Sequence, residues 1–181
     1  MLAKKYSEHS GEKEVFIIRP STITGPRGRY MTGKKGLLYM LKNILPFVPV
    51  ANDDWGRQYV HEDDITDIVG ILTFASSAER KRYEVYNVSP NDIVFGRDMA
   101  EIFKKRAIGI PPFLVRLAFF FAWHLTGGKI PTGRAGWRFF SYPLFVDGRK
   151  VTRELGFDYT STSRNALECD DGRYGYAVLK K

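Results

Sequence analysis

The stretch VFIIRPSTITGPRGRY, residues 15–30, decides the fold class. Its first four residues, Val15 to Ile18, form a short apolar run rich in β-branched side chains, which is typical of a parallel strand buried on both faces. Arg, Pro, Ser, Thr and Gly residues follow directly. In open α/β sheets ligands bind beyond the carboxyl ends of the strands. The stretch therefore predicts a buried strand that ends in a binding loop.

Helix-like and strand-like segments alternate along the chain, and this alternation predicts an α/β fold. The clearest helix is 63–78, because its apolar residues fall on one helical face behind the acidic cluster 62–64. The other expected elements are the last turns of a helix ending at Gly11, helices at 37–45, 96–109, 112–126 and 148–156, and extended segments at 50–64, 83–90 and 142–147. A Gly-, Pro- and Arg-rich connector is expected at 127–138, and a polar tail at 168–181.

Length and charge narrow the class of protein. A chain of 181 residues with 44% hydrophobic content can bury an ordinary core and is expected to form one domain or most of one. The net charge of +8 suits an anionic ligand and does not single out nucleic acid over phosphate groups. The single cysteine, Cys169, excludes an internal disulfide. With no signal sequence in view, a reducing cytoplasm is the expected location.

The most apolar window is PPFLVRLAFFFAWHLTGG, residues 111–128. Arg116 interrupts it, and it is too short for the ~20 apolar residues of a membrane-spanning helix. It predicts a buried or cap-forming helix rather than a transmembrane segment. A helix that lies on a membrane surface stays open as the alternative.

The loop after the first strand carries the first group of candidate ligand-binding side chains. Ser21, Thr22 and Thr24 offer hydroxyls, and Pro20 offers a rigid surface. Glycines within 25–29 permit close backbone approach, and the two arginines of the same segment suit phosphate. A surface turn whose hydroxyls bind their own backbone is an equally good interpretation at this point.

A second group lies in WGRQYVHEDD, residues 55–64. A guanidinium at Arg57, between Trp55 and Tyr59, has the fork geometry that grips a diphosphate through two parallel hydrogen bonds. His61 is a ligand, an acid/base group or a structural residue bonded to the acidic cluster, and the structural role is favoured. The aspartates at 63–64 are expected to cap a helix rather than to catalyse.

Together these segments resemble the extended short-chain dehydrogenase/reductase family, the NAD-dependent epimerases and dehydratases that act on nucleotide sugars. Residues 19–26 match an Arg-Pro-x-x-x-x-Gly-Pro pattern, and residues 57–64 match Arg-x-Tyr-Val-His-x-Asp-Asp. YEVYNVSP at 83–90 and VDGRKVTRELGF at 146–157 are similar to two later motifs of the family. The four motifs occur in the family's order, and the resemblance covers roughly residues 3–167.

The resemblance implies the C-terminal part of a Rossmann-like NAD(P)-binding fold, with an incomplete parallel sheet, plus a small mixed α/β substrate-binding subdomain. It divides the chain into a remnant of the Rossmann-like core with substrate-binding loops (1–90), a C-terminal substrate-binding subdomain (91–167) and the polar tail (168–181). It also implies contacts to NAD or NADP and to a nucleotide sugar. The implied cofactor-binding residues are Pro20, Ser21 and Thr22, and the implied substrate-binding residues are Thr22, Thr24, Arg57 and Arg138. Arg138 is the weaker match, because its neighbours depart from the family's Arg-x-Gly-Asp form.

Two parts of the family pattern are missing from this sequence. No Gly-x-x-Gly-x-x-Gly turn is present to seat a cofactor pyrophosphate, and the catalytic Tyr-x-x-x-Lys that precedes the Arg-Pro strand is absent. The pairs Tyr30/Lys34 and Tyr176/Lys180 match that spacing by chance. We therefore expect no catalytic residue and a partial chain that is inactive alone. It would depend on a missing N-terminal half or on a second chain.

Other interpretations stay open beside this one. An oxidoreductase similar to 3-beta-hydroxysteroid dehydrogenases would use the aromatic helix for a hydrophobic substrate. A non-catalytic basic module would bind RNA or an anionic surface, but the basic residues are scattered among apolar segments. A truncated reading frame would expose an unpaired sheet edge. We expect no nucleic-acid partner and no metal site. A homodimer, the substrate, and the choice of NAD or NADP stay open.

Overall fold

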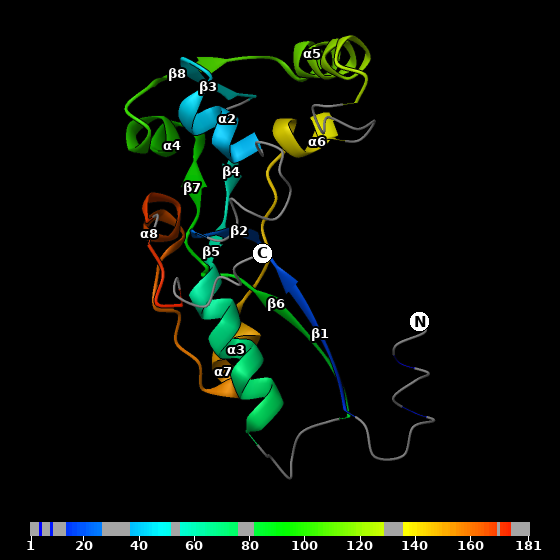
Figure 1. The fold of residues 1–181 in the computed structure, drawn as a ribbon, viewed down its shortest axis with the longest axis vertical. Coiled ribbons are helices and arrows are strands. Elements are labelled where there is room, and N and C mark those ends of the chain that lie inside the picture. The colour runs from blue at the N-terminus through cyan, green and yellow to red at the C-terminus, as the bar shows by residue number, and fades with distance from the viewer. Residues whose placement is uncertain are drawn as a thin grey trace, which may run out of the picture.

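The computed structural model describes residues 4, 8, 14–26, 37–51, 55–75, 82–128, 136–169 and 171–174. Its strands are β1 (Val15–Pro20), β2 (Thr22–Thr24), β3 (Phe47–Val50), β4 (Gly56–Arg57), β5 (Tyr59–His61), β6 (Tyr83–Val88), β7 (Val94–Phe95) and β8 (Arg106–Gly109). Its helices are α2 (Leu37–Asn43), α3 (Glu62–Phe74), α4 (Gly96–Ile102), α5 (Pro112–Leu125), α6 (Gly136–Ser141), α7 (Arg149–Leu155) and α8 (Ser163–Glu168). The fold is mixed α/β, as predicted (Figure 1).

The sheet is small and consists of short strand pairs. β1 pairs with β6, β2 with β5 and β3 with β8, all parallel, and β4 pairs with β7 antiparallel. The chain changes partner at Ser21: its N–H donates to the carbonyl of Val88 at 3.0 Å, and the next N–H, of Thr22, donates to the carbonyl of Gln58 at 3.2 Å. Short parallel pairs of this kind confirm the predicted incomplete parallel sheet.

β1 is less buried than the sequence predicts. Val15 to Ile18 are half-buried rather than enclosed on both faces. Among the described residues β1 pairs only with β6, so its other edge carries no ladder partner there. The ribbon of β1 and β6 extends away from the remaining strands (Figure 1). The structure thus has the unpaired edge expected of an incomplete sheet.

The predicted helix 96–109 is wrong in its second half. α4 ends at Ile102, Lys104 adopts a left-handed conformation with φ 54°, and the chain continues as strand β8. Two tertiary interactions override the helical period of the sequence: β8 pairs along β3, and the ammonium of Lys105 donates to the carbonyls of Leu41 (2.6 Å) and Leu45 (2.5 Å) at the end of α2.

Two helices are not predicted from the sequence. α6 begins within the expected connector 127–138, and α8 lies where no element is expected. The N-terminus of α8 is capped in two ways. The hydroxyl of Thr162 accepts the N–H of Asn165 at 3.1 Å, and the carboxylate of Asp92 accepts the N–H of Ser163 at 2.8 Å. Asp92 is far away in sequence, so only part of this start signal is local.

Two apolar cores meet at β5, where neighbouring residues point to opposite faces. Tyr59 belongs to the core under α4 and α8, and Val60 belongs to the core between α3, β6 and α7.

The buried Gln58 connects the surrounding loops. Its amide donates to the carbonyl of Pro90 at 2.9 Å and accepts the N–H of Val146 at 2.7 Å. Within the segment 142–147, which is predicted to be extended, Leu144 forms an isolated bridge to Arg57. The predicted division of the chain near residue 90 stays a prediction.

We expect Gly148→Ala to lower the free energy of unfolding by about 2–3 kcal/mol, because a Cβ there forces a backbone shift. That Cβ would lie 1.9 Å from the carbonyl oxygen of Ser89. The control is Gly70→Ala within α3, where nothing lies within 4 Å of an added Cβ. Alanine at this helical position should raise stability by about 0.5–1 kcal/mol. Urea unfolding of both variants checks the expectation, and equal stabilities would contradict the close approach at residue 148.

Candidate functional site

The sequence motifs 19–26 and 57–64 lie side by side in the structure. The register of β2 and β5 places Thr22 beside Tyr59 and Thr24 beside His61. Gly25 then follows with φ +125°, and a Cβ on it would lie 2.5 Å from Cγ of Glu62. Glycine is required at this position both by the backbone conformation and by the space available. Segments 19–26 and 57–64 therefore form one structural unit.

Arg57 is the most unusual side chain of this unit. It is only 3% exposed, and both Nη1 and Nη2 are buried with no hydrogen-bond partner among the described residues. Its guanidinium carbon lies 3.9 Å from the ring centroid of Phe139 and 5.4 Å from that of Trp55. Burial lowers the pKa of Arg57 to about 10, and the nearby Tyr59 opposes this shift.

Aromatic faces and flanking strands hold this guanidinium in place. Arg57 lies in β4 and pairs with Val94 of β7. Leu144 forms a bridge to Arg57 from the segment 142–147. Stacking on two rings stabilises a cation by roughly 0.5–2 kcal/mol, which is less than the cost of burying a charge without an anion. The remaining Nη donors have the geometry to bind a carboxylate or phosphate group. The arrangement can therefore bind an anion.

Arg138 lies on α6, next to Phe139, but its environment differs from that of Arg57. It is exposed, and its guanidinium carbon lies 5.6 Å from the ring centroid of Trp137. Arg138 lies on the helix whose Phe139 packs against Arg57, but its own side chain is not buried there. A second phosphate contact from Arg138 stays a prediction. The sequence analysis missed Phe139, although the run WRFF at 137–140 offered aromatic residues beside the predicted arginine.

The loop residues after β1 have different roles in the structure. The hydroxyl of Thr24 donates to the carbonyl of Val60 in the neighbouring strand β5 at 3.4 Å. Thr24 is buried in β2, so the surface-turn interpretation, in which the hydroxyls bind their own turn, is wrong for this residue. The hydroxyl of Ser21 is buried and has no partner among the described residues. Pro20 is exposed and Thr22 is half-buried, at the junction of β1 and β2. The predicted phosphate contacts at Arg27 and Arg29 lie outside the described residues.

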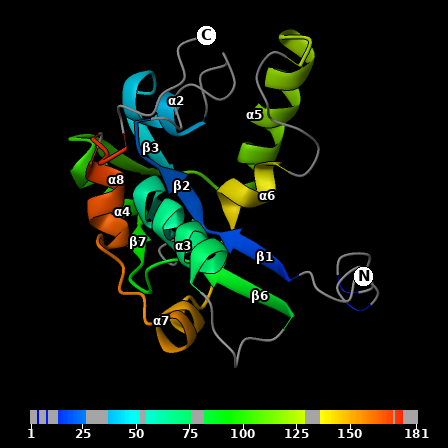
Figure 2. The same ribbon diagram turned by 60° about the horizontal axis from the view of Figure 1, so that its bottom comes forward.

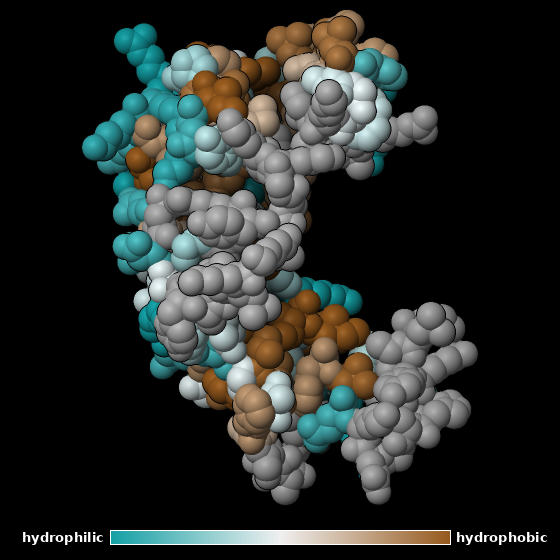
Figure 3. Space-filling model, viewed as in Figure 1, coloured by the Kyte–Doolittle hydropathy of each residue, from teal (hydrophilic) through white to brown (hydrophobic). Residues whose placement is uncertain are grey.

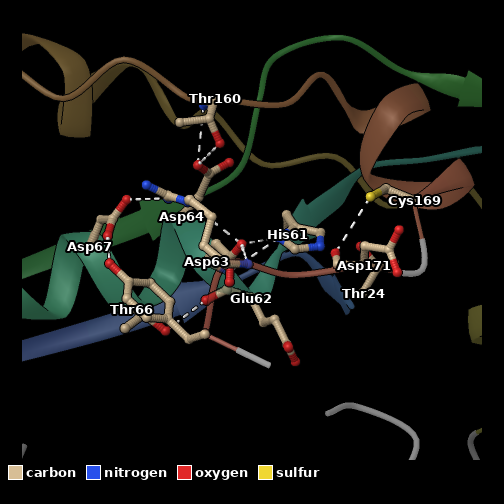
Figure 4. Close-up of polar contacts among 12 residues, drawn as sticks. Thr24, His61, Glu62, Asp63, Asp64, Thr66, Asp67, Thr160, Cys169 and Asp171 are labelled. Atoms are coloured by element: carbon tan, nitrogen blue, oxygen red, sulfur yellow. Dashed lines mark hydrogen bonds and ion pairs between the residues drawn. The ribbon is translucent and has the colours of Figure 1, made fainter. Parts of the chain in front are cut away.

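His61 has a structural role, as favoured from the sequence. It is the N-cap of α3, and its Nδ1 accepts the N–H of Asp63 at 3.2 Å (Figure 4). An accepting Nδ1 leaves the ring proton on Nε2, which is buried without a partner among the described residues. The predicted cap by the aspartates at 63–64 is wrong in one respect: the capping side chain is the histidine, and the carboxylates lie in the first turn.

The carboxylates of α3 bind other segments instead. Asp64 accepts the N–H of Thr160 at 3.1 Å and its hydroxyl at 2.5 Å (Figure 4). Asp63 accepts the backbone N–H of Arg173 at 2.6 Å, and Asp67 accepts the hydroxyl of Tyr174 at 2.7 Å. Residues 171–174 are thus bound to α3. This part of the expected polar tail is held by two buried or half-buried aspartates, which the local sequence does not reveal as its partners.

Neither a metal-binding cluster nor a membrane-spanning helix occurs among the described residues. No group of three or more His, Cys, Asp and Glu side chains there has an arrangement that could hold a metal ion. No described helix combines the length and the apolar character needed to cross a membrane. Cys169 is exposed, and its thiol donates to the carbonyl of Asp171 at 3.4 Å. The pairs Tyr30/Lys34 and Tyr176/Lys180 lie outside the described residues.

The structure matches solved structures of nucleotide-sugar enzymes. UDP-galactose 4-epimerase matches with a TM-score of 0.59 at 16% sequence identity, over 92% of this chain and 47% of that chain. UDP-glucose 4-epimerase from Thermotoga maritima, solved with UDP-glucose, matches with a TM-score of 0.59 at 16% identity, over 93% and 48%. dTDP-glucose 4,6-dehydratase from Bacillus anthracis, in complex with NAD, matches with a TM-score of 0.56 at 16% identity, over 93% and 46%.

These matches establish the fold as part of the Rossmann-like epimerase and dehydratase fold, in agreement with the resemblance seen in the sequence. The chain spans about half the length of the solved structures that it matches. No protein-family model and no curated protein sequence matches it.

We expect Arg57→Met to stabilise the ligand-free protein by about 1–3 kcal/mol, because it replaces a buried cation by an apolar side chain of similar length. The folded state lowers the pKa of Arg57 to about 10, so the unfolded chain holds this proton more tightly. The destabilisation caused by the buried charge of Arg57 is therefore fully present below about pH 10, and it decreases as the pH rises above this value. Urea unfolding at neutral pH and at about pH 11 should show a smaller difference in the free energy of unfolding between Arg57→Met and the unaltered chain at the higher pH.

The exposed Arg153 of α7 provides a control of the same residue type. Arg153→Met should change the free energy of unfolding by no more than about 0.5 kcal/mol. A clear loss of stability in Arg57→Met at neutral pH would show that the guanidinium has an anionic partner within the chain.

Proposed function

We propose that this chain is the C-terminal, nucleotide-sugar-binding part of an NAD-dependent epimerase or dehydratase, and that Arg57 binds the diphosphate of the substrate. One observation carries the proposal: a buried guanidinium with two free Nη groups among the described residues. Its position in β4, two residues before the start of β5, agrees with the Arg-x-Tyr-Val-His motif of the resembling family. The fold supports the same assignment.

A diphosphate suits this position on physical grounds. It supplies the negative counter-charge that the buried guanidinium does not have among its described neighbours, and its oxygens accept two parallel hydrogen bonds. Phe139 and Trp55 exclude water on the sides of the guanidinium that they cover, which strengthens the ion pair. In our proposal Thr22 and Thr24 line the substrate side of the loop, and Arg138 contacts a second phosphate oxygen from α6.

The residues of this chain fit a nucleotide sugar better than a complete dinucleotide. The buried, unpartnered hydroxyl of Ser21, with Pro20 and Thr22, offers a wall for the nicotinamide end of NAD or NADP. The sequence has no Gly-x-x-Gly-x-x-Gly turn for the pyrophosphate. When bound, NAD would accept and return a hydride at a sugar carbon. We assign no catalytic residue to this chain and propose that a separate segment or a second chain supplies the cofactor pyrophosphate site and the Tyr/Lys pair.

Binding of UDP-glucose by isothermal titration calorimetry tests this assignment. We expect the chain to bind UDP-glucose, and Arg57→Met to weaken binding at least about thirtyfold, which corresponds to about 2 kcal/mol for the loss of one charge partner. Arg153→Met should bind as the unaltered chain does. NAD should bind much more weakly than UDP-glucose, because its pyrophosphate has no glycine-rich turn to occupy.

Two results would contradict the proposal. The first is equal affinity of Arg57→Met and the unaltered chain for UDP-glucose, which removes Arg57 from the site. The second is tight binding of NAD by this polypeptide alone, which would show that its cofactor site is complete.

A further inference from the structure

Helix α5 has an ordinary inner face. Val115 is buried, and Phe119 and Ala122 are half-buried. These residues follow one another at intervals of four and three, so they lie on one side of the helix. The ring centroid of Phe119 lies 5.4 Å from that of Phe140 in α6. This side attaches α5 to the rest of the protein, and Figure 2 shows α5 projecting from the molecule with α6 at its base.

The opposite face of α5 is also apolar, and it is open. Phe113, Leu117 and Phe120 follow the same helical spacing, and their side chains are 67%, 48% and 56% exposed. Phe121 and Leu114 widen this outer face and are 50% and 42% exposed. Hydrophobic atoms appear at this end of the molecule in Figure 3. Two exposed polar side chains interrupt the apolar surface of α5: Arg116 at its flank, and His124, whose ring centroid lies 4.3 Å from that of Phe120. A surface helix with this much exposed apolar area is expected to be covered by a further apolar phase or partner.

The segment of sequence that contains α5 carries charge of one sign only. Residues 102–146 contain seven Lys and Arg residues and no Asp or Glu, whereas the rest of the chain has 21 Lys and Arg and 20 Asp and Glu. Basic residues are no denser here than elsewhere. The imbalance comes from the complete absence of acidic residues over 45 positions, and it accounts for +7 of the net charge of +8.

Most of the described basic side chains of this segment are available to an outside partner. Lys104, Arg106 and Arg116 are exposed, whereas Lys105 is used by the carbonyls of α2. Arg138 is exposed as well, but the proposed function assigns it to the substrate and it is not counted here. Arg116 lies on α5 itself, and its alkyl stem can follow the apolar surface while the charge stays at the polar boundary. Trp123, which is 44% exposed, has the amphipathic ring that favours a membrane interface. The two other basic residues of the segment, Lys129 and Arg134, lie outside the described residues.

We propose that α5 lies in the surface of a membrane that contains anionic lipids, with its outer face among the acyl chains. At 14 residues α5 is about 21 Å long, which is shorter than the ~30 Å hydrocarbon core, so the helix lies in the plane of the membrane. A symmetric contact between two copies would bring two faces of the same positive charge together and is disfavoured. The proposal does not involve Arg57 and stands apart from the proposed function.

Cosedimentation of the 181-residue chain with lipid vesicles tests the proposal. We expect binding to phosphatidylcholine vesicles with about 30% phosphatidylserine, and binding at least about tenfold weaker to pure phosphatidylcholine or at high salt. The variant L117E/F120E should lose at least about tenfold in binding to the anionic vesicles, because two carboxylates enter the outer face. Both positions are about half exposed, and circular dichroism verifies that the variant is folded.

Phe74→Glu is the matched control, since Phe74 is 85% exposed but lies on α3. It should bind the anionic vesicles as the unaltered chain does. The proposal is overturned if the unaltered chain ignores anionic vesicles, or if Phe74→Glu and L117E/F120E lose binding equally. Two further results would also overturn it, both in the absence of vesicle binding. In the first, sedimentation shows that L117E/F120E converts a dimer into a monomer. In the second, L117E/F120E abolishes salt-sensitive retention of RNA on filters.

Discussion

The parallel pairing of β2 with β5 is the constraint on which the candidate site depends. Three residue pairs, from Thr22 beside Tyr59 to Thr24 beside His61, join the two motifs. The same strand β5 contributes Tyr59 to one apolar core and Val60 to the other. A register shift by one residue would therefore exchange the faces of β5 and disturb both cores. Gly25 and Glu62 fix this register further, because their close contact leaves no room for a side chain at residue 25.

Much of this arrangement follows from the sequence. The α/β class, helix α3 and the segments after β1 and at 55–61 could be predicted, because apolar periodicity and motif order are local properties. The strand at 106–109 could not, because pairing with β3 and the hydrogen bonds of Lys105 outweigh a helical pattern. The cap of α8 by Asp92 and the binding of residues 171–174 to α3 depend on contacts more than 70 positions apart in sequence.

The sequence singled out Arg57 as a candidate site residue, but it did not reveal that the guanidinium is buried without a partner among the described residues. Its pattern predicted an anion-binding arginine, whereas the packing of Phe139 against it and the absence of a partner among the described residues emerge only in three dimensions. In our proposal this residue lowers the stability of the free protein and strengthens ligand binding, a trade-off that is common at functional sites. His61 illustrates the opposite case: a histidine in a family-like motif serves to cap a helix.

The stacking of Trp55 beside Arg57 gives the protein an optical property. The indole of Trp55 is 1% exposed, and its Nε1 has no hydrogen-bond partner among the described residues, so its electronic transition senses the local electric field rather than water. An anion bound to the neighbouring guanidinium would cancel much of that field. If Arg57 binds a diphosphate, as proposed, the emission of Trp55 should therefore shift when the ligand binds.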